Sequence, residues 1–554
     1  MTLAEKIHAA QTVRNIPPES YTLPYRSIAE LLAYQERVNA EKTFIVFYDE
    51  ANNRTQQRYG EFIHLVRTVA ALMRSLGLQP GDRIATAAHN HPDTIAQYFA
   101  AWLLGLCVVP LNMSEDDERL RYILANSQAK TLFCREEYRE RMLGLMPAET
   151  ALVRVFDDTA TEGGLHRQAE TLPPYIPDGS ASQLDDECFI VYTSGTTGHP
   201  KGVVLTQRNI LADSEAIAAW HGINTETVMM CVLPVHHVNG TIVTHTTPML
   251  TGATTVLQRK FQTEYFFPRI QAEGVHIVSV VPTLLAFLLE ANKIAPLQTV
   301  PETLRYCICG AGPLTCSLAE QFETTFGVRI LHGYGLSETT CYSCYLPIDL
   351  SAEAHRHWMQ DYGFPSIGVA IAANDMAIHD EHGMALGAME RGEIVIRGAN
   401  VMREYFQNPE ANEKTFAYGW FRSGDEGFFD RDADGREYFF ITGRLKELII
   451  RGGVNLAPLE IDEVLARAPG VKAGICVGFE NDFYGEEVGA LVIPESPNTS
   501  KEAILAHCLA AMPFSKAPKV VIFTDSLPVT STGKYQRNSV KHLFAAWKTA
   551  QFRK

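Results

Sequence analysis

The stretch at residues 191–204, VYTSGTTGHPKGVV, holds three glycines, a run of hydroxyl side chains and one lysine between β-branched segments. Glycines let backbone N–H groups approach phosphate oxygens, Ser and Thr hydroxyls add donors, and Lys201 adds positive charge. A Walker P-loop would read G-x-x-x-x-G-K-[ST] and lead into a helix. Here Pro200 and the following GVVLT favour strand, loop, strand. The stretch therefore predicts an anion-binding loop outside the Walker class, with a plain surface loop as the alternative.

The composition indicates a large globular protein. With 554 residues, of which 46% are hydrophobic and 20% charged, the chain is long enough for two or more compact units. The formal net charge is −16, and the basic residues do not gather into a stripe. A nucleic-acid or anionic-membrane partner is therefore disfavoured.

Neither a leader nor a membrane segment is predicted. The first 25 residues contain no apolar core, and no apolar run of about 18 residues occurs. We therefore expect a cytoplasmic protein without a membrane span.

Eleven cysteines are scattered through the chain without a disulfide pattern. Cys341 and Cys344 have metal-knuckle spacing, but no second pair accompanies them. We expect the cysteines to be core or pocket-lining residues.

The chain divides into a large and a small part. Between about residues 28 and 440, helical segments alternate with short β-branched runs, which favours layered α/β architecture with buried sheets. Near residue 440 the pattern becomes denser, with Pro458 placed to start a helix and Thr499-x-x-Glu502 placed as a capping box. We expect a large domain over 1–442, a hinge at 443–446, and a small α+β domain over 447–554.

Six further motifs accompany the loop: LPVHHVNG, CGAGPL, GYGLSETT, WFRSGDEGFFD, GRLKELIIRGGVNLAPLEID and PVTSTGKYQRN. Together with YTSGTTGHPKGVVLT they resemble, in order and over nearly the full chain, the motifs of the adenylate-forming (ANL) superfamily. This superfamily includes acyl-CoA synthetases, adenylation domains of peptide synthetases and beetle luciferases. The resemblance implies two helix-flanked sheets and a small β-barrel-like part in the large domain, with a mobile small domain.

The resemblance also implies a reaction in two halves. A carboxylate attacks the α-phosphorus of ATP to give acyl-AMP and pyrophosphate, and a thiol then displaces AMP to give a thioester. The implied cofactors are ATP, Mg²⁺ and coenzyme A, or the phosphopantetheine of a carrier protein supplied in trans. Both steps require neutralised phosphate charge and a positioned electrophile.

Site residues follow from the matching motif positions. The resemblance assigns nucleotide binding to Thr193, Ser194, Gly195, Thr196, Thr197, Gly198, Lys201, Gly310, Ala311, Gly312, Gly333, Tyr334, Gly335, Thr339, Asp425, Arg444 and Lys534. It assigns catalytic roles to Lys534, His237, Glu338 and Thr193, with Glu338 as the Mg²⁺ ligand. It places the hinge at Lys446 and the thiol-acceptor side at Arg451, Gly452 and Gly453.

The motifs also constrain the acid. The 234–240 segment offers no acidic side chain to pair with an α-ammonium group, so an α-amino acid is disfavoured. The pocket implied by the resemblance is formed by His237, Val238, Asn239, Gly310, Gly312, Cys341 and Tyr342. Its small, mostly apolar wall favours a medium-chain or aromatic acid, although Tyr342 could equally shorten it. His236 is expected to be structural.

Three questions stay open at this stage. Residues 341–362 look like an insertion that forms either a specificity or partner surface or a plain surface loop. The alternatives to a CoA ligase are an acyl-AMP ligase that loads a carrier protein, a luciferase-like oxidase, and a degenerate binding protein. A monomer and a homodimer are both compatible with the sequence.

Overall fold

The computed structural model describes residues 1–155, 171–177, 182–193, 199–296, 299–529 and 535–553. The α-helices are α1 (Leu3–Ala10), α2 (Ile28–Asn39), α3 (Tyr59–Ser75), α4 (Pro92–Leu103), α5 (Asp117–Ser127), α6 (Arg139–Leu143), α8 (Gln207–His221), α9 (Thr247–Thr251), α10 (Phe266–Glu273), α11 (Pro282–Ile294), α12 (Cys316–Phe326), α13 (Ala352–Gln360), α14 (Pro409–Thr415), α15 (Pro458–Ala466) and α16 (Lys501–Ala511). Helices of other pitch include η3 (Asn239–Thr246), η5 (Ser337–Thr339), η7 (Leu445–Glu447) and η8 (Arg537–Trp547).

The strands follow the β-branched runs of the sequence. They are β1 (Thr43–Tyr48), β2 (Arg54–Arg58), β3 (Arg83–Ala87), β4 (Cys107–Leu111), β5 (Thr131–Arg135), β6 (Ala151–Val155), β7 (Glu187–Thr193), β8 (Lys201–Thr206), β9 (Val228–Cys231), β10 (Thr254–Gln258), β11 (Ile277–Val280), β12 (Tyr306–Cys309), β13 (Arg329–Tyr334), β14 (Cys344–Tyr345), β15 (Val369–Ala370), β16 (Asn374–His379), β17 (Gly392–Gly398), β18 (Glu404–Tyr405), β19 (Phe421–Arg431), β20 (Glu437–Arg444), β21 (Ile449–Arg451), β22 (Val454–Leu456), β23 (Val471–Asn481), β24 (Gly485–Pro494) and β25 (Val520–Phe523).

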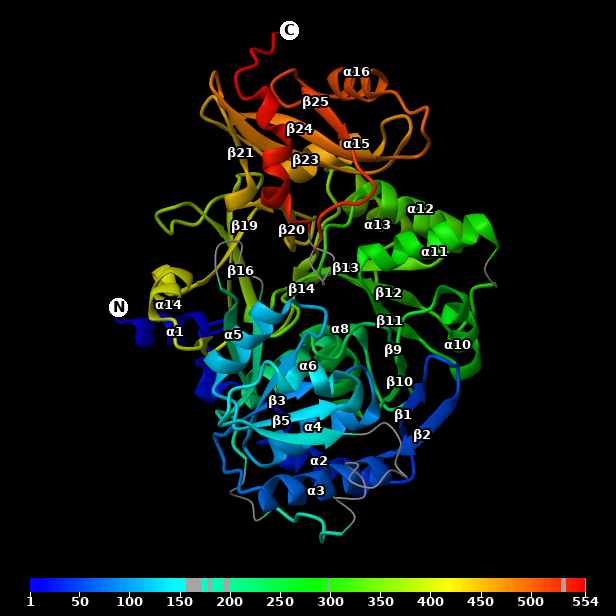
Figure 1. Ribbon diagram of the computed structural model, residues 1–554, viewed down its shortest axis with the longest axis vertical. Coiled ribbons are helices and arrows are strands. Elements are labelled where there is room, and N and C mark those ends of the chain that lie inside the picture. Colours follow the sequence, from blue (N-terminus) through cyan, green and yellow to red (C-terminus); the bar gives the residue numbers. More distant parts are fainter. Residues whose placement is uncertain (156–170, 178–181, 194–198, 297–298, 530–534, 554) are drawn as a thin grey trace.

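Two large sheets form the body of the molecule, as the α/β pattern predicted. Within the described residues, one has the order β18-β8-β7-β4-β3-β5-β6 and the other β15-β14-β13-β12-β11-β9-β10-β1-β2. Most neighbouring strands are parallel and their residues are buried, because helices such as α3 and α4 cover them (Figure 1). Predicted site motifs lie at the ends of β7 in the first sheet and of β12 and β13 in the second.

A third sheet is antiparallel and has the order β16-β17-β19-β20. It leads directly into the C-terminal part, whose sheet β22-β21-β24-β23, extended by β25, stands above the rest in orange and red (Figure 1). β20 ends at Arg444 and the next sheet begins at Ile449. The domain limits and the hinge at 443–446 stay predictions.

The C-terminal part confirms one helix boundary and corrects another. Pro458 is the first residue of α15, as predicted, because its missing N–H is not needed in the first turn. The cap of α16 is Ser500, whose Oγ accepts a hydrogen bond from the Ala503 N–H at 3.1 Å, and not the predicted Thr499. The Thr499 hydroxyl instead donates to the carbonyl of Gly470 at 3.2 Å, which links the start of α16 to the turn between α15 and β23.

The 341–362 segment packs into the body of the molecule. It contains β14 and α13, and the Trp358 indole is buried and stacks on the Tyr438 ring with centroids 3.8 Å apart. The His355 Nε2 lies 2.8 Å from a carboxylate oxygen of Glu323 on α12. These contacts therefore anchor α13 to β20 and α12.

All eleven cysteines are buried free thiols. In the described part of the chain, no three His, Cys, Asp or Glu side chains are grouped to hold a metal ion. Nor does any helix in these residues have the length and apolar character needed to cross a bilayer.

Candidate active site

The two strands predicted on either side of the loop in the opening stretch are present as β7 and β8. β7 and β8 pair antiparallel, with Thr193 opposite Lys201, so the glycine-rich loop joins two neighbouring strands. Ser194, Gly195, Thr196, Thr197 and Gly198 lie outside the described residues. The base of the loop is fixed to α5, because the Tyr192 hydroxyl donates to Asn126 at 2.6 Å and His199 stacks on Tyr122 at 4.4 Å.

Lys201 faces the predicted metal ligand across an aromatic ring. Its Nζ lies 4.5 Å from the ring centroid of Tyr405, and the Tyr405 hydroxyl donates to the Glu338 carboxylate at 2.8 Å. Burial lowers the pKa of Lys201, while the charge of Glu338 raises it. A buried carboxylate can bind a divalent cation, and a neighbouring lysine can neutralise the phosphate that the cation also binds. The residues present therefore fit Mg²⁺ bound to a nucleotide phosphate.

A second cluster joins three residues predicted to hold the nucleoside. The Tyr334 hydroxyl donates to Asp425 Oδ2 at 2.7 Å, and Arg444 Nε lies 3.2 Å from Asp425 Oδ1. Asp425 and Arg444 are directly opposite each other on β19 and β20, so strand register sets their pairing. The Asp425 charge raises the pKa of Arg444. A carboxylate has about four acceptor positions, so Asp425 retains capacity for sugar hydroxyls, and the cluster fits a ribose.

The predicted nucleotide-binding glycines have packing reasons of their own. A Cβ on Gly335 would lie 1.9 Å from the Cys341 carbonyl oxygen, and one on Gly333 would lie 2.4 Å from the Tyr345 ring. A Cβ on Gly310 would lie 2.6 Å from the Tyr342 hydroxyl. These close approaches bring the 341–345 segment against the ends of β12 and β13.

Two other predicted nucleotide contacts take part in local geometry. Ala311 has a left-handed backbone with φ +64°, beside Gly312 in the turn after β12. The Thr339 hydroxyl accepts a hydrogen bond from the Leu336 N–H at 3.1 Å, which closes the turn at η5.

The residues predicted to surround the acid also lie together. The Asn239 amide donates to the Tyr342 hydroxyl at 3.2 Å, and the Ser279 hydroxyl donates to the Asn239 carbonyl oxygen at 2.8 Å. All three side chains are buried, with Tyr342 only 2% exposed, and they come from η3, β11 and the segment after η5. Val238 and Cys341 adjoin them in the chain and are also buried. The cluster is therefore a polar network inside an apolar surround.

The two predicted histidines lie side by side at the start of this cluster. The rings of His236 and His237 have centroids 4.3 Å apart, and the His237 N–H donates to the Pro234 carbonyl at 3.1 Å. Burial, with the neighbouring His237, lowers the pKa of His236, and its expected structural role stays a prediction. His237 leads directly into the π-helix η3, a form that is frequent at functional sites.

Behind Tyr342 lies a carboxylate that the motifs did not reveal. Asp213 on α8 is fully buried, accepts from the Asn400 amide at 2.8 Å, and faces the Tyr342 N–H at 3.4 Å. Burial raises the pKa of Asp213 to about 8. Its signal in the sequence was an acid within the apolar face formed by Ile210 and Ile217.

Tyr405 and Ser279 were also missed. Tyr405 lies in the short strand β18, which pairs with β8, so it reaches Lys201 only through a long-range strand pairing. No local pattern marks either residue.

Of the predicted C-terminal residues, Lys446 lies close enough to Lys201 for its charge to lower the pKa of that lysine, whereas the others make contacts elsewhere or lie outside the described residues. Arg451 pairs with Glu487 at 2.7 Å and lies over the Tyr484 ring. Gly452 and Gly453 form the exposed turn between β21 and β22, with φ of +58° and +81°. Lys446 is exposed in η7. Lys534 lies outside the described residues.

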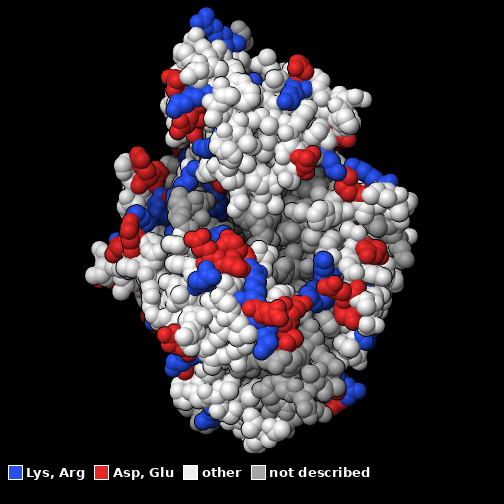
Figure 2. All heavy atoms as spheres, viewed as in Figure 1, with Lys and Arg blue, Asp and Glu red and all other residues white. Residues whose placement is uncertain are grey.

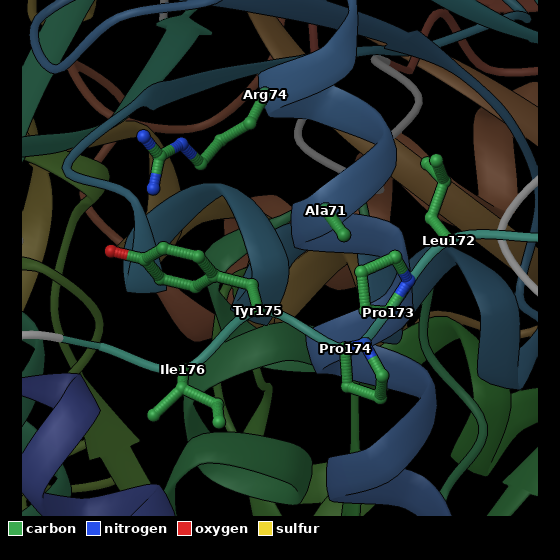
Figure 3. A pocket seen from close by; sticks show the side chains of 7 residues that line it. All are labelled: Ala71, Arg74, Leu172, Pro173, Pro174, Tyr175 and Ile176. Carbon is green, nitrogen blue, oxygen red and sulfur yellow. The ribbon is translucent and has the colours of Figure 1, made fainter.

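A surface hollow lies away from these clusters. A shallow hollow at the end of the molecule opposite the C-terminal part is formed by α3 and residues 172–176, with Arg74 over the Tyr175 ring (Figures 1 and 3). Its lining carries prolines and aliphatic side chains and no acid or histidine. Figure 2 shows acidic and basic side chains interspersed over the visible face, without an extended basic area.

The two-part α/β fold, with a Tyr–Asp–Arg cluster for a nucleoside and a Lys–Tyr–Glu cluster for phosphate and cation, defines an adenylate-forming enzyme. The model of the AMP-binding enzyme family matches residues 32–406, and that of the AMP-binding enzyme C-terminal domain matches residues 460–534. The chain belongs to the AMP-binding enzyme family.

Individual relatives agree with this assignment. The sulfoacetate–CoA ligase of Cupriavidus necator is 32% identical, over 93% of this chain and 97% of that protein. The oxalate–CoA ligase of Arabidopsis thaliana is 31% identical, over 89% of this chain and 94% of that protein. The crystal structure of ATP-bound MatB from Rhodopseudomonas palustris superposes with a TM-score of 0.82 at 25% identity, covering 93% of this chain and 99% of that one. The protein is an AMP-forming acid–CoA ligase that uses ATP, Mg²⁺ and coenzyme A.

Proposed function

We propose that the protein activates a short, polar carboxylic acid and transfers the acyl group to coenzyme A. The observation that carries the proposal is the buried network of Tyr342, Asn239 and Ser279 at the predicted acyl position. A long apolar chain placed there would have to displace the Tyr342 ring, which stacks on Tyr345 at 4.4 Å, and would leave buried polar groups unpaired. A short acid with a polar substituent could instead hydrogen-bond to the network.

The relatives span several acid classes, so they do not choose among them by name alone. Two relatives above 30% identity act on sulfoacetate and oxalate, whereas others act on feruloyl or long-chain fatty acyl groups. The sequence alone favoured a medium-chain or aromatic acid. The buried Tyr342 ring at the predicted acyl position is the reason that we propose a short acid instead.

In the proposed first half-reaction, Asp425 and Arg444 hold the ribose, Glu338 holds Mg²⁺, and Lys201 neutralises phosphate charge. Lys534 is proposed, from the resemblance, to bridge the carboxylate and the α-phosphate. Two anions at about 4 Å repel by several kcal/mol at an intermediate dielectric, so these cations have a large effect on the approach of the acid. The loop at 193–198 completes the phosphate contacts in this proposal.

In the proposed second half-reaction, the small domain turns about Lys446 and residues 451–453 approach the acceptor. Coenzyme A is the expected acceptor, and a carrier protein in trans is the alternative. A cytoplasmic location and a monomeric or homodimeric state remain sequence predictions.

The test is acid-dependent pyrophosphate release over a panel of oxalate, sulfoacetate, ferulate, octanoate and an α-amino acid, with and without coenzyme A. We expect the highest kcat/KM with the short acids and an AMP-forming reaction that yields the CoA ester. If no acid causes pyrophosphate release, the proposal that the protein activates an acid of these classes is refuted. A higher kcat/KM with octanoate or ferulate would refute the short-acid proposal. Adenylation without a CoA ester would favour the carrier-protein alternative.

Two substitutions separate shape from hydrogen bonding. Tyr342→Phe keeps the ring but removes the hydroxyl, so KM for the short acid should rise about fivefold to tenfold. Tyr342→Ala removes the ring and should increase activity with ferulate relative to the short acid. If both variants keep the wild-type order of acids, Tyr342 does not set the acid size.

A further inference from the structure

The small domain is fastened to the large one by a buried carboxylate at a helix end. Glu463 on α15 accepts hydrogen bonds from the backbone N–H groups of Cys316 at 3.0 Å and Ser317 at 3.2 Å. These are the first two residues of α12, whose N-terminal N–H groups have no partners within the helix. The 11-residue α12 presents the positive end of its dipole to this carboxylate. Figure 1 shows α15 above α12, and the two helices are in contact.

This contact differs from the other links across the same boundary. Glu463 is 7% exposed, and Arg467, the residue that follows α15, lies 2.9 Å away and completes its pairing. The ion pairs Arg391–Glu460 at 3.6 Å and Lys472–Glu290 at 3.9 Å are longer and join partly exposed side chains. Exposed pairs contribute little, whereas a buried carboxylate that accepts two N–H bonds contributes much more. Burial raises the pKa of Glu463, as expected of a carboxylate removed from water.

Its position connects the domain placement to the nucleotide-binding segment. α12 is preceded by the turn that contains Gly310, Ala311 and Gly312, so Glu463 holds the helix that ends this turn. In the same arrangement the turn at Gly452 and Gly453, predicted to face the thiol, is exposed to solvent. Among the described residues, a Cβ on Gly453 would meet no atom within 4 Å and one on Gly452 would meet only the Tyr484 ring of the same domain, so in this arrangement the turn is not packed against the large domain.

We infer that Glu463 is a positioning residue for the adenylation half-reaction, acting by holding the small domain against the N-terminus of α12. The inference rests on the proposed function, because it requires an adenylation step and a separate thioester step. Glu463 does not touch the reacting groups. Its loss should therefore slow one half-reaction selectively.

The first variant is Glu463→Gln, which keeps the shape but turns an amide NH₂ toward backbone donors. Acid-dependent ATP–pyrophosphate exchange should fall about tenfold, which is the effect of losing one charge-assisted hydrogen bond. Thioester formation from supplied acyl-AMP and coenzyme A should stay within about twofold of wild type. The matched control is Glu460→Gln, one turn earlier on α15, which should leave both half-reactions unchanged because its links are partly exposed.

A second variant removes the donor from the large domain. Cys316→Pro deletes the N–H that reaches Glu463, and the preceding Thr315 is extended with ψ 151°, which suits a residue before proline. It should reproduce the selective loss without altering the small domain. Equal losses in both half-reactions, or equal effects of the Glu460 control, would overturn the inference.

Trypsin cleavage near the exposed Lys446 gives a readout independent of catalysis. Glu463→Gln and Cys316→Pro should each be cut there faster than wild type, at unchanged thermal midpoint of the large domain. If the wild type shows no ATP–pyrophosphate exchange with any acid, the proposed function is refuted. Unchanged cleavage in both variants would independently refute the role of Glu463 in holding the small domain against α12.

Discussion

At the residue scale, the chemistry of this site depends on polar groups held out of water. Asp213 is the clearest case, because its only described side-chain partner is the Asn400 amide and no cation faces it in the described structure. A fully buried carboxylate without a cation is more stable when protonated. Asp213 therefore supports the segment at Tyr342 as a neutral hydrogen-bonding group.

The first prediction concerns pH. The pKa of Asp213 rises from 3.8 to about 8 on folding, so folding takes up a proton at this residue between these two pH values. Its stabilising contribution is full below pH 3.8 and is lost as pH rises through 8. The slope is at most about 1.4 kcal/mol per pH unit. Asp213→Asn lacks this titration. The thermal midpoint of the wild type should therefore fall relative to that of Asp213→Asn as pH rises from 5 to 8. A constant difference over that range would contradict the prediction.

At the element scale, the sequence predicted the strands and the hairpin but not their long-range partners. The runs at β3, β4, β5, β7, β10, β11 and β13 were predictable because β-branched residues between helical segments are typical of buried parallel strands. The strand, loop, strand order at 191–204 followed from Pro200 and the valines after it. The pairing of β18 with β8, which brings Tyr405 to Lys201, depends on residues about 200 positions apart. Local patterns carry no information on such a pairing.

The candidate site shows the same division. Asp425 and Arg444 were predictable from motifs, but their direct opposition on β19 and β20 appears only in the strand register. Thr499 was predicted as a cap and Ser500 takes that role, because two adjacent hydroxyl residues satisfy the same local pattern.

An element-level prediction tests the close approach at the end of β13. Gly335→Ala would place a Cβ 1.9 Å from the Cys341 carbonyl oxygen and 2.6 Å from the Tyr342 Cα, both backbone atoms that cannot rotate away. We expect a loss of about 2–3 kcal/mol in the free energy of unfolding and weaker acid activation. The control is Gly144→Ala, where the nearest atom lies at 3.5 Å and φ is −81°. Denaturant unfolding of both variants measures the difference, and equal stability would disprove the packing argument.

At the scale of the whole molecule, charged groups run from the nucleoside cluster into the small domain. Arg444 pairs with Asp425 at the end of β20, and Glu447 follows it in η7. Glu447 lies 3.7 Å from Arg537, which is buried against Asp462. The predicted hinge is therefore bordered by ion pairs on both sides. A rotation about Lys446 would therefore leave the Glu447–Arg537 pair within the small domain and the Asp425–Arg444 pair within the large one.

The last prediction concerns this inner pair. Arg537 donates to Asp462 Oδ1 at 3.1 Å and to the Cys476 carbonyl at 2.9 Å, and both Arg537 and Asp462 are 4% exposed. Arg537→Met would leave the Asp462 carboxylate buried without its cation, which costs about 3–5 kcal/mol. We expect the small domain to unfold at a lower temperature, ahead of the large domain, in calorimetry.

The control and the double variant make the cause specific. Lys548→Gln breaks an exposed pair with Glu480 on the same domain and should leave the midpoint unchanged. Adding Asp462→Asn to Arg537→Met should recover part of the loss, because the isolated charge is then removed. If the double variant is as unstable as the sum of the single ones, the two side chains are not coupled. Recovery would instead show that the ion pair, and not the bulk of Arg537, holds the small domain together beside the hinge.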